Sequence, residues 1–126
     1  MSEIVCLEIG AVLWLIHVLV QGGIGNAAFP PGYLTTARDT PLNTENVYFG
    51  RATRALANYV ENFVVFAALD LGLIVTNHGG GYGATLWILA RAIYIPLYLS
   101  GVQYVRTIVW VISLVGLIMM WVRLAF

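Results

Sequence analysis

Four polar side chains lie at helical spacing within a largely apolar sequence. Arg51, Arg54, Asn58 and Glu61 are separated by three, four and three residues, which places them along one face of a helix, with Asn62 beside it. Two cations followed by a carboxylate ~10–15 Å farther along the helix suit a cleft for a zwitterionic or anionic small molecule. The same spacing fits an interhelical hydrogen-bond network that only holds a bundle together. Spacing alone leaves both interpretations open.

A second polar group follows later in the chain. Tyr94 and Tyr98 are four residues apart, which places them one turn apart on one helical face. Arg106 lies near the expected start of the next helix. A cation there has the wrong sign for the helix dipole, so it needs lipid headgroups or a bound anion as a partner. Aromatic residues near a membrane surface are also ordinary anchors, so the tyrosines alone are weak evidence.

The remaining ionisable residues predict structure more than chemistry. Asp70 and Arg91 would lie at about the same depth in antiparallel helices joined by a short loop, and we predict a buried structural ion pair. His17 and His78 have no carboxylate or histidine partners at ligand spacing, and Cys6 is the only cysteine. No metal site and no disulfide within one chain are therefore expected.

Composition defines the solvent around this chain. Its 126 residues are 60% hydrophobic and only 10% charged, whereas soluble domains are usually about 25% charged. This balance excludes an ordinary soluble domain and predicts lipid as the surroundings. The formal net charge is zero, which gives no indication of a nucleic-acid partner. All six basic residues are arginines, a weak sign of anion binding, because guanidinium groups pair well with carboxylates.

Long apolar runs predict an all-α integral membrane protein with four spans in a single domain, residues 1–126. Gly22, Gly23 and Gly25 are expected to break the first run. The second helix is expected to begin near Thr44 or Glu45, with Thr44 as its N-cap. The glycine-rich segment 77–83 has no following lysine and no preceding strand, so it is a loop and not a phosphate-binding motif. The expected spans are 4–21, 45–76, 84–102 and 105–125, with a polar loop over 22–44.

The arginines predict an orientation. If the chain crosses four times, one side carries four of them and the other carries Arg123 alone; the four are Arg38, Arg51, Arg54 and Arg106. The positive-inside rule then places loop 22–44 in the cytoplasm and both termini outside.

The segment Arg51–Phe66, RATRALANYVENFVVF, resembles the second-helix signature of the membrane-associated proteins in eicosanoid and glutathione metabolism, the MAPEG family. Four spans, the polar first loop and the Tyr94–Tyr98–Arg106 run agree with it over the whole chain. The resemblance implies a homotrimer of left-handed four-helix bundles. It also implies that glutathione, as co-substrate, binds near the cytoplasmic interface between neighbouring subunits.

The resemblance also implies roles for individual residues. Arg106 matches the arginine that stabilises the glutathione thiolate, so it is the expected catalytic residue. Tyr94 and Tyr98 match positions that complete the pocket from the next subunit. The full set expected to bind glutathione is Arg51, Arg54, Asn58, Glu61, Asn62, Tyr94, Tyr98 and, from the first loop, Arg38.

Two positions depart from the eicosanoid-synthesising branches of the family. Ala57 replaces a basic residue of one branch and Asn62 replaces a tyrosine of another. Eicosanoid synthesis is therefore not expected, and the chain resembles the small bacterial members, in an inner membrane. The implied activity is a glutathione transferase or peroxidase acting on lipophilic electrophiles or hydroperoxides, as in detoxification. The alternatives are a non-catalytic ligand-binding or scaffold protein, and a small multidrug transporter, which would need a carboxylate in the middle of the first span.

Overall fold

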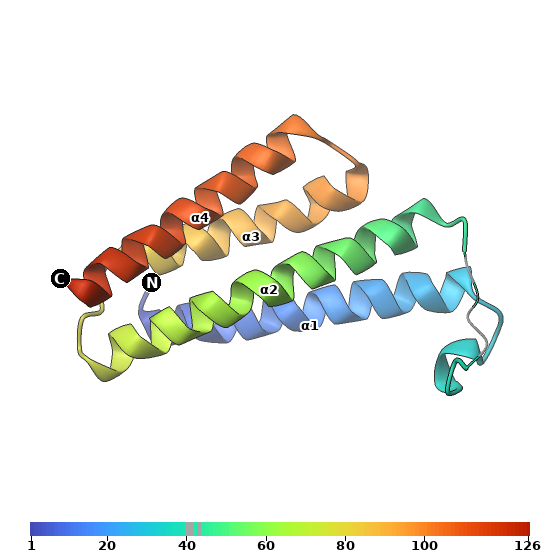
Figure 1. Ribbon diagram of the computed structural model, residues 1–126, viewed down its shortest axis with the longest axis horizontal. Helices are drawn as coiled ribbons and strands as arrows, with labels where there is room; N and C mark the ends of the chain where they lie inside the picture. Colours follow the sequence, from blue (N-terminus) through green and yellow to red (C-terminus); the bar gives the residue numbers. More distant parts are fainter. Residues whose placement is uncertain (40–41, 43) are drawn as a thin grey trace.

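The computed structural model describes residues 1–39, 42 and 44–126, and this part of the chain is helical apart from its connections. A 3-10 turn, η1 (Tyr33–Thr35), lies in the first connection. Figure 1 shows α1 beside α2 and α3 beside α4, with both termini at the same end of the molecule. The predicted all-α, four-helix organisation is thus confirmed. The four long helices are α1 (Glu3–Ala28), α2 (Val47–Val75), α3 (Gly83–Ser100) and α4 (Tyr104–Ala125).

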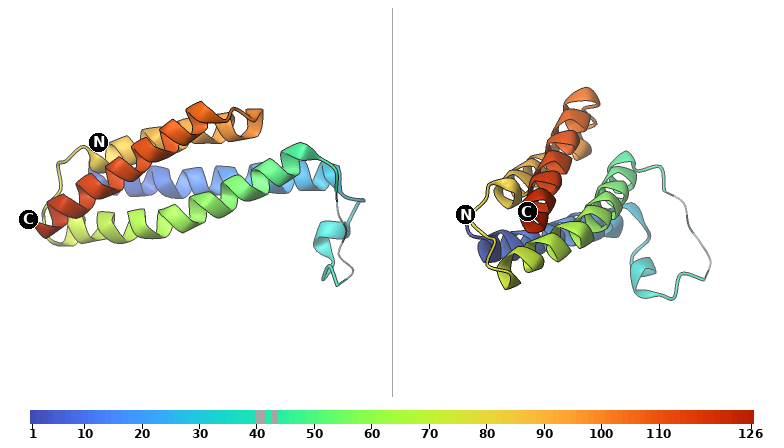
Figure 2. Two further views of the ribbon diagram at one scale, coloured as in Figure 1. Left: turned by 45° about the horizontal axis from the view of Figure 1, so that its top comes forward. Right: turned by 60° about the vertical axis from the view of Figure 1, so that its left-hand side comes forward.

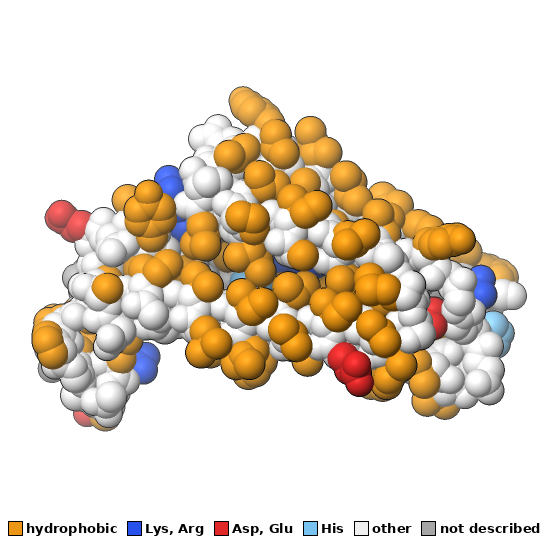
Figure 3. All heavy atoms as spheres, turned by 180° about the vertical axis from the view of Figure 1, so that it is seen from behind, with side chains coloured by type: hydrophobic (Ala, Val, Ile, Leu, Met, Phe, Trp, Pro, Cys, Tyr) orange, Lys and Arg blue, Asp and Glu red, His pale blue; other side chains and the backbone are white. Residues whose placement is uncertain are grey.

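The surface of these helices is apolar. Each helix is long and apolar enough to cross a membrane, and large hydrophobic side chains such as Leu19, Val64, Val75 and Trp121 are exposed. Orange side chains cover most of the face shown in Figure 3. Soluble proteins rarely expose apolar surface on this scale, whereas lipid accommodates it. The helices therefore form a membrane-spanning bundle.

Helix α1 is longer than its sequence predicts. It continues past Gly22, Gly23 and Gly25 and ends at Ala28, so the expected end near residue 21 was wrong. Gly25 approaches α2 so closely that a Cβ there would lie 2.8 Å from the Phe49 ring, and this contact offsets the low helix propensity of glycine. The helix ends just before Phe29, whose extended backbone is the conformation favoured before a proline.

Helix α2 begins at a side-chain cap. The Asn46 side chain accepts hydrogen bonds from the backbone N–H groups of Tyr48 and Phe49, at 3.0 and 3.2 Å. Asparagine is a favoured N-cap because its oxygen satisfies N–H groups that have no partner within the helix. The cap is therefore Asn46, and the expected cap at Thr44 was wrong. Thr44 instead accepts a hydrogen bond from the Asn46 N–H at 3.2 Å.

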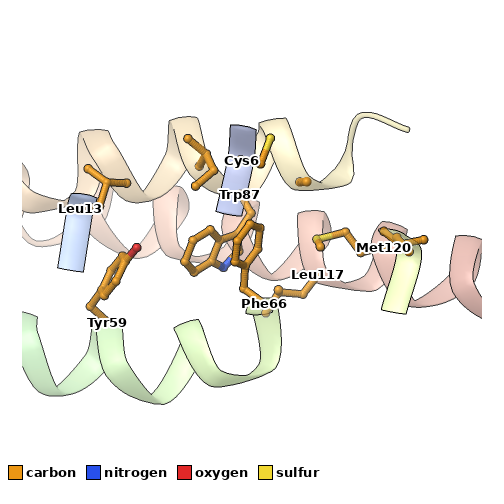
Figure 4. Packing of buried hydrophobic residues seen from close by; sticks show 10 residues of the cluster. Cys6, Leu13, Tyr59, Phe66, Trp87, Leu117 and Met120 are labelled. Carbon is orange, nitrogen blue, oxygen red and sulfur yellow. The ribbon is translucent and has the colours of Figure 1, made fainter. Parts of the chain in front are cut away.

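Aromatic rings form the centre of the bundle. Trp87 of α3 is fully buried and stacks on Phe66 of α2 with 4.1 Å between ring centroids. In Figure 4 Trp87 lies between Tyr59 on one side and Met120 on the other. The Tyr59 hydroxyl donates to the Gly10 carbonyl of α1. This cluster fixes α2 against α1 and α3, and it sets the depth of the polar residues near Tyr59.

Helices α3 and α4 approach each other through two glycines. A Cβ at Gly83 would lie 2.7 Å from the Gly116 carbonyl oxygen, and a Cβ at Gly116 would lie 2.8 Å from the Gly83 carbonyl oxygen. Small residues at such crossings let backbones pack closely inside membranes, where the hydrophobic effect does not drive helices together. The pair therefore sets the spacing of α3 and α4.

The α2–α3 connection is held by residues near both ends of the chain. Glu3, in the first turn of α1, accepts a hydrogen bond from the Gly80 N–H at 2.8 Å. Arg123, in the last turn of α4, donates to the His78 and Gly79 carbonyls at 2.6 Å each. These bonds compensate for the conformational freedom of a glycine-rich segment.

Replacing Arg123 by alanine should lower the free energy of unfolding by about 1 kcal/mol, because two carbonyls lose a charged donor at an exposed position. Denaturant titration of the detergent-purified protein measures this change. Arg123→Lys keeps the charge but not the forked donors, so its free energy of unfolding should lie between those of the natural protein and the alanine variant. An alanine variant as stable as the natural protein would contradict this role of Arg123.

Candidate functional site

A polar pocket of about 350 Å³ lies between α2, α3 and α4, away from the termini. This volume is within the usual range of ~300–1,000 Å³ for small-molecule sites. Helix α2 lines one wall, and the ends of α3 and α4 next to their shared connection line the others. Figure 2 shows these ends of α3 and α4 lying together. The lining residues are Arg54, Ala57, Asn58, Glu61, Tyr94, Tyr98, Arg106, Thr107 and Trp110.

Helix α2 supplies both signs of charge. Arg54, Asn58 and Glu61 face the pocket together, as their spacing of four and three residues predicts. Arg54 and Glu61 are exposed and Asn58 is half-buried. The pocket thus offers a guanidinium, an amide and a carboxylate along one wall, in that order.

Helices α3 and α4 supply aromatic hydroxyls and a second guanidinium. The rings of Tyr94 and Tyr98 meet edge to face, with 5.5 Å between their centroids. The Arg106 guanidinium carbon lies 4.6 Å from the centroid of the Tyr98 ring. This cation–π contact holds Arg106 at the pocket, although the helix N-terminus disfavours a cation there.

One chain is sufficient to bring the α2 residues and the tyrosines together. The resemblance implied that Tyr94 and Tyr98 complete the pocket of a neighbouring subunit. In the structure they line the same pocket as Arg54, Asn58 and Glu61 of their own chain. The antiparallel course of α2 and α3 explains this, because it places the first turns of α2 near the last turns of α3 (Figure 1).

Three lining residues were missed by the sequence analysis: Ala57, Thr107 and Trp110. Trp110 follows Arg106 by four residues, so helical spacing could have indicated it. Its Nε1 atom is buried and has no hydrogen-bond partner among the described residues. Trp110 therefore adds an aromatic side chain to the pocket wall.

Three expected binding residues lie outside the pocket lining. Arg51 donates from Nη1 to the Leu99 carbonyl at 3.0 Å, where its charge suits the C-terminal end of α3. Arg38 donates to the Leu34 carbonyl at 2.8 Å in the first connection. Asn62 donates from Nδ2 to the Asn58 carbonyl at 2.8 Å within α2. Residue type alone could not show which of Arg51 and Arg54 lines the pocket. The difference arises from the C-terminal end of α3, which binds Arg51.

The ion pair predicted between Asp70 and Arg91 is not formed. Both side chains are fully buried within the chain, so neither can reach a second subunit. Arg91 instead donates from Nη2 to Asn58 Oδ1 at 2.8 Å. Asn58 lies twelve residues, or ~18 Å of helix, from Asp70. Both Asp70 carboxylate oxygens are buried and lack a hydrogen-bond partner within the described residues.

The prediction failed because α2 does not end at the depth where α3 begins. Phe66 stacks on Trp87, which lies in the second turn of α3, whereas α2 continues from Phe66 to Val75. At ~1.5 Å per residue, α2 extends ~8 Å beyond the start of α3. Asp70 therefore lies at the level of the first residues of α3, and Arg91 lies nearer to Asn58.

A second hollow, of about 620 Å³, lies at the end of the bundle that carries the termini. Its walls include Ile118, Met119, Val122 and Phe126, together with Glu3 and Arg123. Those two charged groups are hydrogen-bonded to the α2–α3 connection. The smaller pocket, where unlike charges converge, is therefore the better candidate for a polar ligand.

Four apolar helices and a charged pocket near one end of the bundle define a class: an integral membrane protein with a polar pocket. The MAPEG family model matches residues 5–126. This chain therefore belongs to the MAPEG family, as its second-helix segment predicted. No curated protein matches the chain.

Proposed function

We propose that the pocket binds glutathione and that Arg106 stabilises the bound thiolate for attack on a lipophilic electrophile or hydroperoxide. One observation carries this proposal: Arg54, Glu61 and Arg106 converge in a single pocket of about 350 Å³. Membership of a family named for membrane-associated proteins in eicosanoid and glutathione metabolism supports glutathione as the ligand.

The pocket and glutathione have complementary charges. Glutathione has two carboxylates, one ammonium group and one thiol. A guanidinium such as that of Arg54 can bind a carboxylate through paired, charge-assisted hydrogen bonds. The Glu61 carboxylate can accept from the ammonium group. The amide of Asn58 and the hydroxyls of Tyr94 and Tyr98 can form hydrogen bonds with the peptide groups of glutathione.

The second guanidinium has a chemical role. A free thiol has a pKa near ~8.5, so only a few per cent is thiolate at neutral pH. A cation within a few ångströms favours the charged form, and lowering the pKa by one or two units raises the thiolate fraction about tenfold or more. The thiolate then forms a bond to an electrophilic carbon as a leaving group departs. With a hydroperoxide it attacks the terminal oxygen, so that an S–O bond forms as the O–O bond breaks and the alcohol leaves. A second glutathione then reduces the resulting sulfenic acid, which gives the disulfide and water.

The membrane supplies the second substrate. A lipophilic electrophile reaches the pocket through the bilayer and glutathione reaches it from the water phase, so the reaction occurs at the interface. The arginines of the pocket end, Arg51, Arg54 and Arg106, support a cytoplasmic location for this end under the positive-inside rule. The same rule places both termini outside the cytoplasm. Family membership supports a homotrimer of left-handed bundles, and we propose a bacterial inner membrane as its location.

The neighbouring arginines of α2 provide a matched test. Arg54→Ala should weaken glutathione binding at least about tenfold, because the pocket loses a charged donor. Arg51→Ala removes the same charge three residues away, where the side chain binds the end of α3, and should change the dissociation constant less than about threefold. Calorimetry on the detergent-purified proteins measures both constants. Equal losses in the two variants would contradict the assigned site.

A further inference from the structure

Arg91 is a fully buried arginine behind the pocket. It does not line the pocket. Its guanidinium carbon lies 4.6 Å from the centroid of the Tyr94 ring, 5.4 Å from that of Tyr59 and 5.9 Å from that of Trp87. Such contacts hold a cation by its attraction to aromatic faces. An ionised group this deep in a membrane bundle is costly and is retained where it has a role.

The hydrogen bond from Arg91 determines how the Asn58 amide is turned. A guanidinium can only donate, so the atom of Asn58 that lies 2.8 Å from Arg91 Nη2 must be the oxygen Oδ1. The amide nitrogen Nδ2 must then occupy the other branch of the side chain. Among the described residues, no acceptor is bonded to Nδ2, and Asn58 lines the pocket. Asn58 is thus held with its donor free for a ligand.

We propose that Arg91 is a positioning residue that presents Asn58 Nδ2 to the pocket as a donor. The ligand atom opposite Asn58 is then an acceptor, a carbonyl or carboxylate oxygen, and not an N–H or ammonium group. This inference rests on the proposed function, because glutathione supplies that acceptor. It also predicts selectivity: at Asn58 the pocket accepts a ligand with a hydrogen-bond acceptor and rejects one with a donor. Arg91 determines this preference from outside the pocket.

A double-mutant cycle separates positioning from a general structural role. Arg91→Met frees the Asn58 amide to rotate and should weaken glutathione binding about tenfold, the effect of one misdirected hydrogen bond. In an Asn58→Ala background the same change should weaken binding less than about twofold, because there is no amide to orient. Calorimetry on the full-length protein gives the four dissociation constants. Equal effects in both backgrounds, or no effect in either, would overturn the proposal.

Asn58→Asp provides a signature that mere loss of structure does not give. The aspartate still accepts from Arg91, now through a charge-assisted bond, so the thermal midpoint should stay the same or rise. The pocket, however, now presents an oxygen to the ligand's acceptor, and glutathione binding should fall at least about tenfold. Parallel losses of stability and binding would contradict the proposal.

If Arg91→Met does not fold, Arg91→Lys replaces it in the cycle. Lysine keeps a donor for Asn58, so this variant should bind glutathione more tightly than Asn58→Ala.

The failure of the proposed function can be told apart from failure of this inference. Absence of glutathione binding by the natural protein rejects the proposed function alone. The same four proteins then give a ligand-free cycle of thermal midpoints. Non-additive midpoints for Arg91→Met and Asn58→Ala support the positioning contact, whereas additive midpoints reject it.

Discussion

Arg106→Ala should remove the thiolate signal of bound glutathione while reducing binding far less. Arg106 lies in the pocket against Tyr98, and its charge favours the thiolate over the thiol. Without this cation the thiolate fraction at neutral pH should fall about tenfold or more. Ultraviolet difference absorbance at saturating glutathione measures the fraction, and calorimetry on the same samples measures the dissociation constant.

Arg54→Ala is the matched control for this experiment. Its guanidinium is assigned to a carboxylate of glutathione, so the variant should bind more weakly. Once it is saturated, it should still show the thiolate signal. Arg106→Lys keeps the charge and should retain part of the signal. If Arg106→Ala loses binding and thiolate signal in the same proportion, the residue is a binding group and its catalytic assignment is wrong.

Gly116→Ala should destabilise the bundle by about 1–3 kcal/mol, the usual effect of overpacking. The new Cβ would lie 2.8 Å from the Gly83 carbonyl oxygen and 3.0 Å from the Trp87 backbone nitrogen. Backbone atoms cannot rotate away as a side chain can, so α3 and α4 must separate. Denaturant titration in detergent measures the change in the free energy of unfolding.

Gly23→Ala is the control for the glycine pair. It also lies within a helix, but a Cβ there would have no atom within 4 Å. Alanine has the higher helix propensity, so this variant should be as stable as the natural protein or up to about 1 kcal/mol more stable. If both variants change stability alike, helix propensity and not the approach of α3 to α4 determines the result.

Much of the fold could be predicted because the signals are local. Long apolar runs identified the four helices. The errors lie at helix ends, where tertiary contacts decide. The contact of Gly25 with Phe49 continues α1 through a glycine-rich segment. Sequence alone offered Thr44 as the cap of α2, whereas the structure uses Asn46.

The site was predicted only in part, for a similar reason. Periodicity placed Arg54, Asn58 and Glu61 on one face, and they do share a pocket. Periodicity cannot determine the relative depth of two helices, so it paired Arg91 with Asp70. The stacking of Phe66 on Trp87 fixes that depth and brings Arg91 to Asn58. Residue type also could not show that Arg51 caps α3.

The central claim is that this pocket binds glutathione and holds it as the thiolate. The most direct measurement is a glutathione titration of the detergent-purified protein. Calorimetry reports binding in this titration, and ultraviolet absorbance reports the thiolate. We predict saturable binding with a thiolate signal at neutral pH that Arg106→Ala removes. No binding at millimolar glutathione would contradict the claim, and the pocket would then have to serve another ligand.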